Sequence, residues 1–390
     1  MADLRDAGGE GQLGEIASVF LKLGLLGFGG PAAHIGMMEE EFVRRRAWVS
    51  RERFLDLLGA ANLIPGPNST EMAIHLGRER AGWRGLILAG ACFILPAFVI
   101  VLGFAWVYAR FGTLPAAQGL LYGVKPVMIA VVLQALWGLG RTATRTGPIA
   151  AVGLLSLCAA AAGLHELLVL LAAGLRLGGL AWAPGAKRAG AAGFWPMLPP
   201  VAVGVTAPAV AAAATPFGLA PLFLFFLKVG SVLFGSGYVL LAFLRADLVQ
   251  RWGWLTEAQL LDAVAVGQVT PGPVFTTATF IGYVLGGLPG AVAATVGIFL
   301  PSFVFVALSG PLVPRLRRSP VASGFLDGVN VASIALMALV TVQLGRAAVV
   351  DVPTAFVALV ATVLLIQFRV GSAWLVLAGA LAGLAITMLP

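Results

Sequence analysis

Two copies of one short motif decide the fold of this chain. The first reads Pro65-Gly66-Pro67-Asn68-Ser69-Thr70, and the second reads Pro271-Gly272-Pro273-Val274-Phe275-Thr276. Each copy lies in an apolar stretch, where proline and glycine interrupt a helix. Between Arg53 and Arg78 the first break leaves about 11 residues on each side, or about 16 Å of helix, which is half a bilayer. We therefore expect structural breaks at Pro65, Gly66, Pro67, Pro271, Gly272 and Pro273.

The composition around these motifs requires a membrane. Of 390 residues, 59% are hydrophobic and 11% are charged, against roughly 25% charged residues in soluble domains. Uncharged runs such as residues 263–314 are long enough for more than one crossing. They show no alternation of period two, which excludes an outer-membrane barrel. The net charge of +8 fits basic loops, so we expect an all-α integral membrane protein that binds membrane lipid and no nucleic acid.

The two motifs belong to an internal repeat. Phe20-Leu21-Lys22 matches Phe226-Leu227-Lys228, and the match continues through the two motifs to Leu139-Gly140-Arg141 and Leu344-Gly345-Arg346. A long series of matches at a nearly constant spacing indicates duplication. The sequence therefore predicts four segments: a polar N-terminal tail (1–15), a first transmembrane repeat (16–188), a linking transmembrane segment (189–221) and a second transmembrane repeat (222–390).

Basic residues predict that the two repeats have opposite orientations. The connection with Arg78, Arg80 and Arg84 is basic, whereas its counterpart, residues 286–290, carries no charge. Conversely, the turn after residue 109 holds only Arg110, whereas its counterpart holds Arg315, Arg317 and Arg318. Basic loops stay cytoplasmic. Equivalent loops therefore face opposite sides, which is typical of an inverted-topology repeat.

Each broken segment permits two local structures. Basic residues flank the first on both sides, with Arg53 before it and Arg78 after it. This pattern favours a re-entrant hairpin with Pro65-Gly66-Pro67 at its tip, and a similar hairpin around residues 27–31. A single kinked spanning helix is the alternative. Irregular backbone at membrane depth requires protein or a water-filled cavity to satisfy its polar groups, so the tips mark a cavity.

The residues around the breaks suit an anion. Helix N-termini attract anions, and we expect free N–H groups from Asn68 to Thr70 and from Val274 to Thr276. Lys22 and Lys228 occupy equivalent places in apolar segments, where an unneeded lysine costs at least about 2.5 kcal/mol. The expected substrate-binding residues are Lys22, Gly29, Gly30, Asn68, Ser69, Thr70, Lys228, Gly235, Thr276 and Thr277.

Glu71 and His75 break the symmetry, because their matching positions are Thr277 and Ile281. Burial raises the pKa of a carboxyl group, and histidine titrates near neutrality. The pair is therefore a candidate for proton coupling. The alternative is that Glu71 pairs with Arg78 or Lys22 and only neutralises charge. No metal-ligand pattern is present, since His165-Glu166 lacks a second histidine at the required spacing, and no cofactor is expected.

At the motifs Phe28-Gly29-Gly30-Pro31-Ala32-Ala33-His34-Ile35-Gly36, Pro65-Gly66-Pro67, Ala81-Gly82-Trp83 and Leu95-Pro96, the chain resembles the chromate ion transporter family, in its long two-domain type. The likeness covers nearly the whole chain. It implies export of chromate, an inorganic oxyanion, from the cytoplasm across the cell inner membrane, with sulfate as a structural mimic and the membrane potential or a proton gradient as driving force. We expect a secondary active transporter that works by alternating access, with one repeat rocking against the other around the bound anion. Glu71 stands where the resemblance implies a neutral residue, which leaves the substrate open.

Other functions remain as alternatives. The anion could be sulfate or an organic acid, and a passive channel would show unsaturated flux. An intramembrane enzyme would need Ser69, His75 and Glu71 together, but Ser69 and His75 project about 120 degrees apart on one helix. We therefore expect no enzyme and no catalytic residues. A homodimer is left open.

Overall fold

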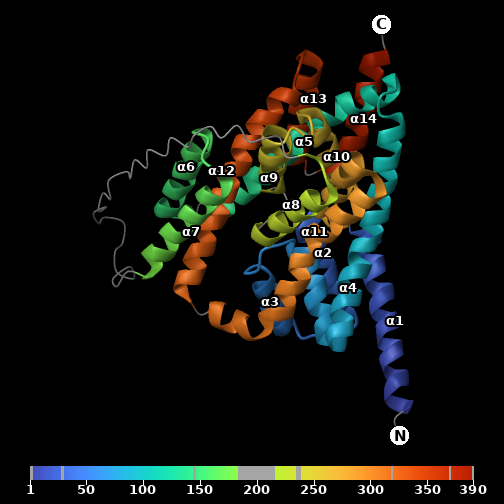
Figure 1. Cartoon of the computed structure of the whole chain (residues 1–390), viewed down its shortest axis with the longest axis vertical. Coiled ribbons are helices and arrows are strands. Elements are labelled where there is room, and N and C mark those ends of the chain that lie inside the picture. The colour runs from blue at the N-terminus through green and yellow to red at the C-terminus, as the bar shows by residue number, and fades with distance from the viewer. Residues whose placement is uncertain are drawn as a thin grey trace.

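The structure is a computed structural model that describes residues 3–27, 30–143, 146–182, 216–233, 239–317, 319–368 and 370–388. These residues form helices and connections without a strand (Figure 1). The expected all-α membrane architecture with two homologous halves and broken helices is confirmed. Most of the expected linking segment lies outside the described residues, and its residues 219–221 belong to a helix of the second repeat.

The helices of the first repeat follow one another in a fixed order. They are α1 (Asp3–Leu26), α2 (Gly30–Glu39), the π-helix η1 (Glu40–Arg45), α3 (Arg51–Ala61), α4 (Asn68–Phe111), α5 (Pro115–Ala143), α6 (Gly147–Ala161) and α7 (Glu166–Trp182). Ser50 caps α3 by accepting a hydrogen bond from the N–H of Arg53. Helix α3 ends just before Pro65-Gly66-Pro67, and α4 begins just after it.

The second repeat has the same order. It comprises α8 (Leu219–Val232), α9 (Leu240–Phe243), the π-helix η3 (Leu244–Arg251), α10 (Glu257–Val269), the short η4 (Val274–Thr276), α11 (Thr277–Arg317), α12 (Pro320–Ala348), α13 (Val352–Ile366) and α14 (Ser372–Met388). Thr256 and Gln259 form a capping box at the start of α10. In Figure 1, α3 lies in the lower half of the molecule and its counterpart α10 in the upper half, as an inverted repeat requires.

The long helices α4 and α11 each contain a reversal of chain direction. Gly82 in α4 and Gly287 in α11 have φ angles of 58° and 60°, which favour glycine. Beyond the reversal, Gly85 lies so close to Gly77 that a side chain on either would clash with the other's backbone. Residues 68–80 therefore return antiparallel to the segment that begins at residue 83.

The ends of the first hairpin lie together. The Arg53 guanidinium contacts the Glu79 carboxylate at 2.6 Å, which joins the start of α3 to the end of the returning segment. The chain thus enters and leaves the hairpin at the same end of the molecule. This geometry supports the hairpin over the kinked spanning helix.

Cysteine labelling tests this topology. In a variant with Cys92 and Cys158 replaced by alanine, we expect the exposed positions in Glu52→Cys and Arg84→Cys to react from the same membrane face. Arg110→Cys, at the other end of α4, is the control and should react from the opposite face. Labelling of Glu52→Cys and Arg84→Cys from opposite faces would contradict the hairpin.

Within the described ranges, four helical segments are long and apolar enough to cross a membrane: Asn68–Phe111, Pro115–Arg141, Val274–Ser309 and Pro320–Ala348. Shorter apolar helices accompany them in both repeats. Large apolar side chains such as Trp137 and Phe356 are exposed on the outer surface. A lipid environment accounts for such exposure, whereas a water-soluble monomer rarely has it over so much of its surface.

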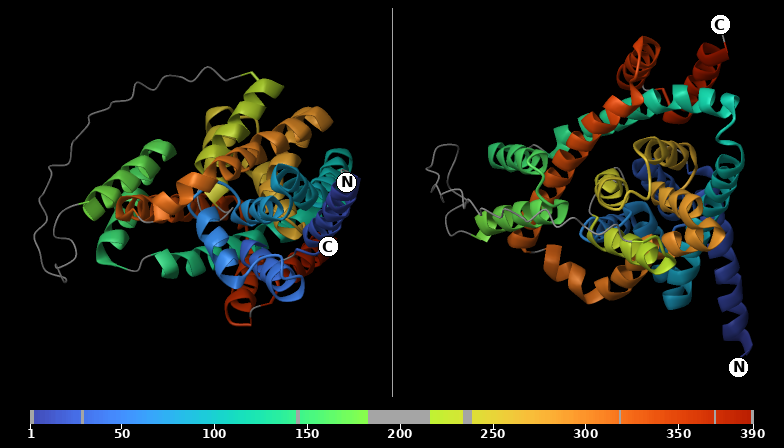
Figure 2. Two further views of the ribbon diagram at one scale, coloured as in Figure 1. Left: turned by 90° about the horizontal axis from the view of Figure 1, so that it is seen from below. Right: turned by 45° about the horizontal axis from the view of Figure 1, so that its top comes forward.

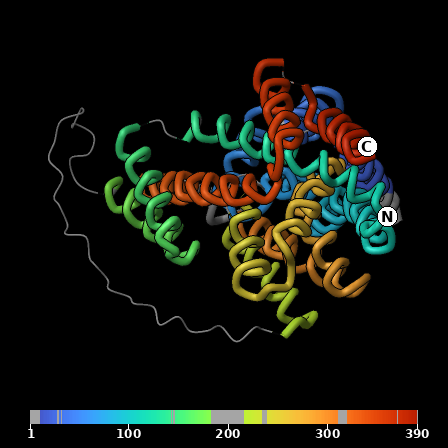
Figure 3. The backbone as a smooth tube through the Cα atoms, turned by 90° about the horizontal axis from the view of Figure 1, so that it is seen from above, coloured from blue at the N-terminus to red at the C-terminus, as the bar shows by residue number. Residues whose placement is uncertain are grey.

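The two repeats do not form two separate bundles. Helix α5 packs along α13 and α14 of the other repeat, and α12 packs along α6 and α7 of the first (Figure 3). Glycines permit both close approaches, because a side chain on Gly123 would clash with α14 and one on Gly328 would clash with α7. The last two helices of each repeat are therefore exchanged.

This exchange divides the molecule into two parts built from both repeats. We call α1–α4 and α8–α11, with their short helices, the core; α4 and α11 pack together at its centre. We call α5–α7 and α12–α14 the scaffold, in which α5 and α12 pack against each other. In the right-hand view of Figure 2, the scaffold arches over the core.

Candidate functional site

The chain breaks of the two repeats meet at the centre of the core. The N–H of Gly66 donates to the carbonyl of Leu233 at 2.7 Å, just before the break that follows α8. The N–H of Gly272 donates to the carbonyl of Gly27 at 2.8 Å, just before the break that follows α1. Each Pro-Gly-Pro tip is thus tied to the other repeat. The two bonds are reciprocal, which places an approximate two-fold axis between the tips.

His34 adds a polar contact at this centre. Its Nε2 lies 2.8 Å from the carbonyl oxygen of Gly27, which also accepts the Gly272 bond. The ring packs edge-on against Phe93 and is 2% exposed. His34 therefore positions one of the two breaks. His34 belongs to the sequence motif of residues 28–36, but the sequence of that motif does not show that its ring contacts the Gly27 carbonyl.

The first turn of α4 offers fewer backbone donors than expected. The N–H groups of Thr70 and Glu71 bond to the carbonyl of Pro67, at 2.8 and 3.0 Å. In the second repeat the N–H of Thr276 bonds in the same way to Pro273. The expectation of a free N–H at Thr70 and Thr276 is therefore wrong, because each first turn closes on its own proline carbonyl. Asn68 and Ser69 have no backbone acceptor among the described residues.

Glu71 lies in the wall between the two repeats. Its side chain is fully buried, and the Ser302 hydroxyl of α11 lies 3.5 Å from its Oε1. Its Oε2 has no hydrogen-bond partner in the described part of the chain. The matching place in the other repeat holds Thr277, and the place matching Ser302 holds Ala97. One side of the centre is therefore acidic and the other is neutral.

The proposed alternative partners of Glu71 lie elsewhere. The Arg78 guanidinium donates to the backbone carbonyls of Val306 and Ala307 at 2.7 and 3.0 Å. Lys22 is exposed on α1. The alternative that Arg78 or Lys22 neutralises Glu71 is therefore wrong. His75, one turn after Glu71, is 5% exposed, and its Nε2 has no partner among the described residues.

The two equivalent lysines have different surroundings. Lys228 donates to Asp247 at 2.5 Å, and Asp247 also pairs with Arg251 one turn further on. In the first repeat the residue matching Asp247 is Glu41, which pairs with Arg46 at 2.7 Å. Lys22 remains exposed. The structure thus gives Lys228 a buried carboxylate and leaves Lys22 facing outward.

The remaining candidates are distributed around the breaks. Ser69 and Thr70 are buried, and the Thr70 hydroxyl has no partner among the described residues. The amide of Asn68 donates to Asn62 at 2.6 Å. The hydroxyls of Thr276 and Thr277 bond to carbonyls of their own turn. Gly30 begins α2 with a φ of 77°, whereas Gly29 and Gly235 lie outside the described residues.

Ion pairs mark the two ends of the core, and their polarity is reversed. In the first repeat Glu39 pairs with Arg51 at 3.5 Å, and at the matching places of the second Arg245 pairs with Glu257 at 2.6 Å. At the end with Arg51, Glu15 also contacts Arg46 and Arg80. Burial opposes ionisation of Glu15, but hydrogen bonds from the two arginines outweigh it and lower its pKa.

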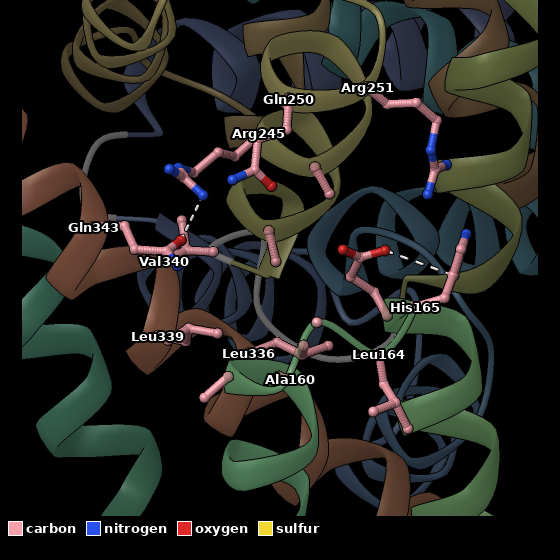
Figure 4. A pocket seen from close by; sticks show the side chains of 15 residues that line it. Ala160, Leu164, His165, Arg245, Gln250, Arg251, Leu336, Leu339, Val340 and Gln343 are labelled. Carbon is pink, nitrogen blue, oxygen red and sulfur yellow. Dashed lines mark hydrogen bonds and ion pairs between the residues drawn. The ribbon is translucent and has the colours of Figure 1, made fainter. Parts of the chain in front are cut away.

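A cavity of about 650 Å³ lies between core and scaffold at the end with Arg245 (Figure 4). It is lined on the core side by η3, and on the scaffold side by α12 and the turn between α6 and α7. Arg245 reaches across and donates to Gln343 of α12 at 2.5 Å. The polar lining residues are His165, Glu166, Arg245, Gln250, Arg251 and Gln343.

Membrane-spanning helices, an inverted repeat and paired breaks define a class, the multi-pass membrane transport proteins. The sequence profile of the chromate transporter family matches residues 14–178 and again 220–384, and the chain belongs to that family. Its members are transport proteins, which confirms the expectation that the chain is not an enzyme. No solved structure matches the fold.

Three relatives cover most of the chain. A chromate transport protein of Cupriavidus metallidurans is 35% identical over 371 residues, which are 94% of this chain and 91% of the relative. A chromate transport protein of Pseudomonas aeruginosa is 35% identical over 86% of this chain and 82% of its own length. A probable chromate transport protein of Synechococcus elongatus is 33% identical over 90% of this chain and 89% of its own length.

Proposed function

We propose that the chain is a secondary active transporter that exports chromate across the cell inner membrane by alternating access. The main support is that each Pro-Gly-Pro tip is hydrogen-bonded to the chain break of the opposite repeat, Gly66 to Leu233 and Gly272 to Gly27. Transporters with inverted repeats bind their substrates where such broken helices meet. The names of the relatives supply the substrate.

The direction rests on charge. The end of the core with the first hairpin carries Arg44, Arg45, Arg46, Arg51, Arg53, Arg78, Arg80 and Arg84. By the rule that basic connections stay inside, this end faces the cytoplasm. The opposite end, with η3 and the start of α10, then faces outward. Export of a doubly charged anion is favoured by a membrane potential that is negative inside.

The anion would bind at the first turns of the half-helices. The N–H groups of Asn68 and Ser69 and the hydroxyl of Thr70 are donors without acceptors in the described structure. The charge of Lys22 in one repeat, and in the other the one excess positive charge of the Lys228–Asp247–Arg251 cluster, would raise the local anion concentration. The proposed substrate-binding set is completed by Gly30, Thr276 and Thr277, and by Gly29 and Gly235, which lie outside the described residues.

Glu71 and His75 would couple the anion to protons. A carboxylate and an oxyanion repel each other, and no cation pairs with Glu71 in the described part of the chain. Occupation of the site and protonation of Glu71 are then linked. Transport of another anion, such as sulfate or an organic acid, is the second candidate. Sulfate is a tetrahedral dianion like chromate, and the Glu71 carboxylate favours none of these anions over the others.

Uptake into inverted vesicles tests the proposal. We expect saturable chromate uptake that sulfate inhibits, that depends on a gradient and that falls at least about tenfold in Lys22→Ala, a loss of about 1.4 kcal/mol. Glu71→Gln should remove the pH dependence of uptake, whereas Glu52→Gln, at an exposed carboxylate, should retain it. Uptake no greater than in vesicles without the protein would contradict chromate as substrate.

A further inference from the structure

Among the residues that the structure describes, core and scaffold pack extensively against each other at one end. Helix α10 packs against α5, α12 and α14, and α9 packs against α12. Their counterparts α3 and α2 pack on other core helices and have no comparable packing on the scaffold within the described residues. If the two repeats occupied equivalent states, these contacts would be symmetric. Core and scaffold are therefore joined at the end with α9 and α10, which we call the closed end, beside the cavity of about 650 Å³ that η3 lines.

An ion pair joins core and scaffold at this closed end. Lys125 of scaffold helix α5 lies 3.4 Å from Oδ1 of Asp262 in core helix α10. The other carboxylate oxygen of Asp262 accepts a hydrogen bond from the Tyr108 hydroxyl at 2.9 Å. Tyr108 belongs to core helix α4, so it holds the carboxylate in place from within the core. Asp262 is 3% exposed, and removal of one partner from a buried pair is strongly unfavourable.

A second polar contact joins the same two parts. Arg245 of η3 donates to Gln343 of α12 (Figure 4). The Glu257 carboxylate also contacts the Arg245 guanidinium, at 2.6 Å. The cavity of about 650 Å³ lies beside this contact. A π-helix such as η3 is uncommon and often marks a functional segment. In the described part of the chain, two polar side-chain contacts thus join core and scaffold at the closed end, Lys125–Asp262 and Arg245–Gln343.

The first repeat cannot form either contact. The residue matching Lys125 is Asn330, which carries no charge to pair with Asp56, the residue matching Asp262. The residue matching Gln343 is Gly138, which has no amide side chain, and the residue matching Arg245 is Glu39. Pseudo-symmetric closure at the opposite end would therefore lack the Lys–Asp ion pair and the Arg–Gln hydrogen bond that join the two parts here.

We propose that Lys125 and Asp262 form a one-sided gate between a core and a scaffold that move against each other during transport. The moving parts are then not the two repeats, since each part contains helices of both. This proposal rests on alternating access, and it adds the residues that set which end is closed. Tyr108 is a positioning residue for Asp262, and Arg245–Gln343 is a second contact of the same gate.

A distance measurement across the cavity tests the gate. Spin labels at Gln250→Cys in the core and Leu164→Cys in the scaffold, both exposed residues of the cavity lining, are placed in a variant without Cys92 and Cys158. The parent should show mainly the short distance. Lys125→Ala and Asp262→Asn should each increase the open fraction, with its longer distance, about tenfold or more.

Two controls separate gating from misfolding. Asn330→Ala, at the position matching Lys125, should keep the parent distances. Exchange of the charges in Lys125→Asp with Asp262→Lys should restore the short distance that the single variants lose. Gel filtration and melting temperature identify variants that remain folded. Folded single variants with the parent distance distribution would overturn the gate.

Chromate uptake by the same variants separates this proposal from the proposed function. Longer distances in the single variants, with no uptake by the parent, would leave the gate standing and remove chromate export. Unchanged distances together with saturable uptake by the parent would remove the gate and leave export standing. Restored distance in the exchanged pair with restored uptake supports both.

Discussion

Replacement of Gly66 by alanine is expected to reduce chromate uptake at least about tenfold, equivalent to a loss of 1.4 kcal/mol. Gly66 has a φ of 140°, where a side chain costs about 1–3 kcal/mol in backbone strain. The added Cβ would also overlap Oε1 of Glu71 and lie 2.5 Å from the Ser302 hydroxyl. The tip would have to shift, and with it the bond from Gly66 to Leu233. The measurement is uptake into inverted vesicles, normalised to the amount of protein.

Substitutions at two other glycines serve as comparison and control for this experiment. Gly272→Ala, at the other tip, should also lose uptake, since its φ is 94° and its Cβ would lie 2.8 Å from that of Ala97. Gly36→Ala should behave as the parent, because nothing lies within 4 Å of the added Cβ. A Gly66→Ala protein with parent uptake would show that the tip tolerates displacement and is not part of the transport path.

Separation of the chain into residues 1–188 and 189–390 is expected to give two fragments that function only together. Alone, the first lacks α13 and α14 for the surface of α5, and the second lacks α6 and α7 for the surface of α12. Each exposed interface consists of small residues that pack better on a helix than on lipid. Co-expression should restore uptake, and each fragment alone should be degraded or aggregated. Protease resistance and membrane content measure this directly.

A glycine substitution shows whether the exchanged interface is the cause. Gly123→Leu in the first fragment inserts a side chain that clashes with Gly379 and Gly383 of α14, and overpacking of this kind costs about 1–3 kcal/mol. It should abolish recovery of uptake. Gly103→Leu, where the added Cβ has no neighbour within 4 Å, should permit it. A first fragment that is stable and protease-resistant alone would contradict the exchanged packing.

The order of the elements could be predicted from sequence because the repeat displays its own symmetry. Pro65-Gly66-Pro67 and its copy indicated where helices break, and the basic residues indicated that the halves are inverted. Gly82 and Gly287 were visible as matching glycines, but only the structure shows that the chain reverses there. Sequence matches between the two repeats show which residues are equivalent, but they do not show which helices pack against each other.

For that reason the exchange of helices could not be predicted. Gly123 in α5 and Gly379 in α14 are separate small residues in the sequence, and many pairings of small-residue helices are compatible with membrane packing. The same limit applies to Asp262. Its place in the sequence gives no sign that Lys125 and Tyr108 approach it from two other helices.

The candidate site was predicted in outline and not in its contacts. Glu71 was recognised from its departure from symmetry, and the structure places it, fully buried, beside Ser302. Ser302 follows Pro301 in an apolar run and gave no signal of its own. Lys22 and Lys228 looked alike because their sequence surroundings match. They differ because Lys228 pairs with Asp247, whereas Glu41, the residue that matches Asp247, pairs with Arg46 and not with Lys22.

The exchanged packing also constrains how the protein is made. Helix α5 leaves the ribosome long before α14 exists, so its glycine face must remain among lipids or insertion factors while the second repeat is translated. The first repeat therefore cannot complete its folding before the second repeat has been synthesised. A premature stop, or failure of a late helix to insert, leaves α5 without α13 and α14. Cellular quality control should then recognise the uncovered surface of α5 in the first repeat.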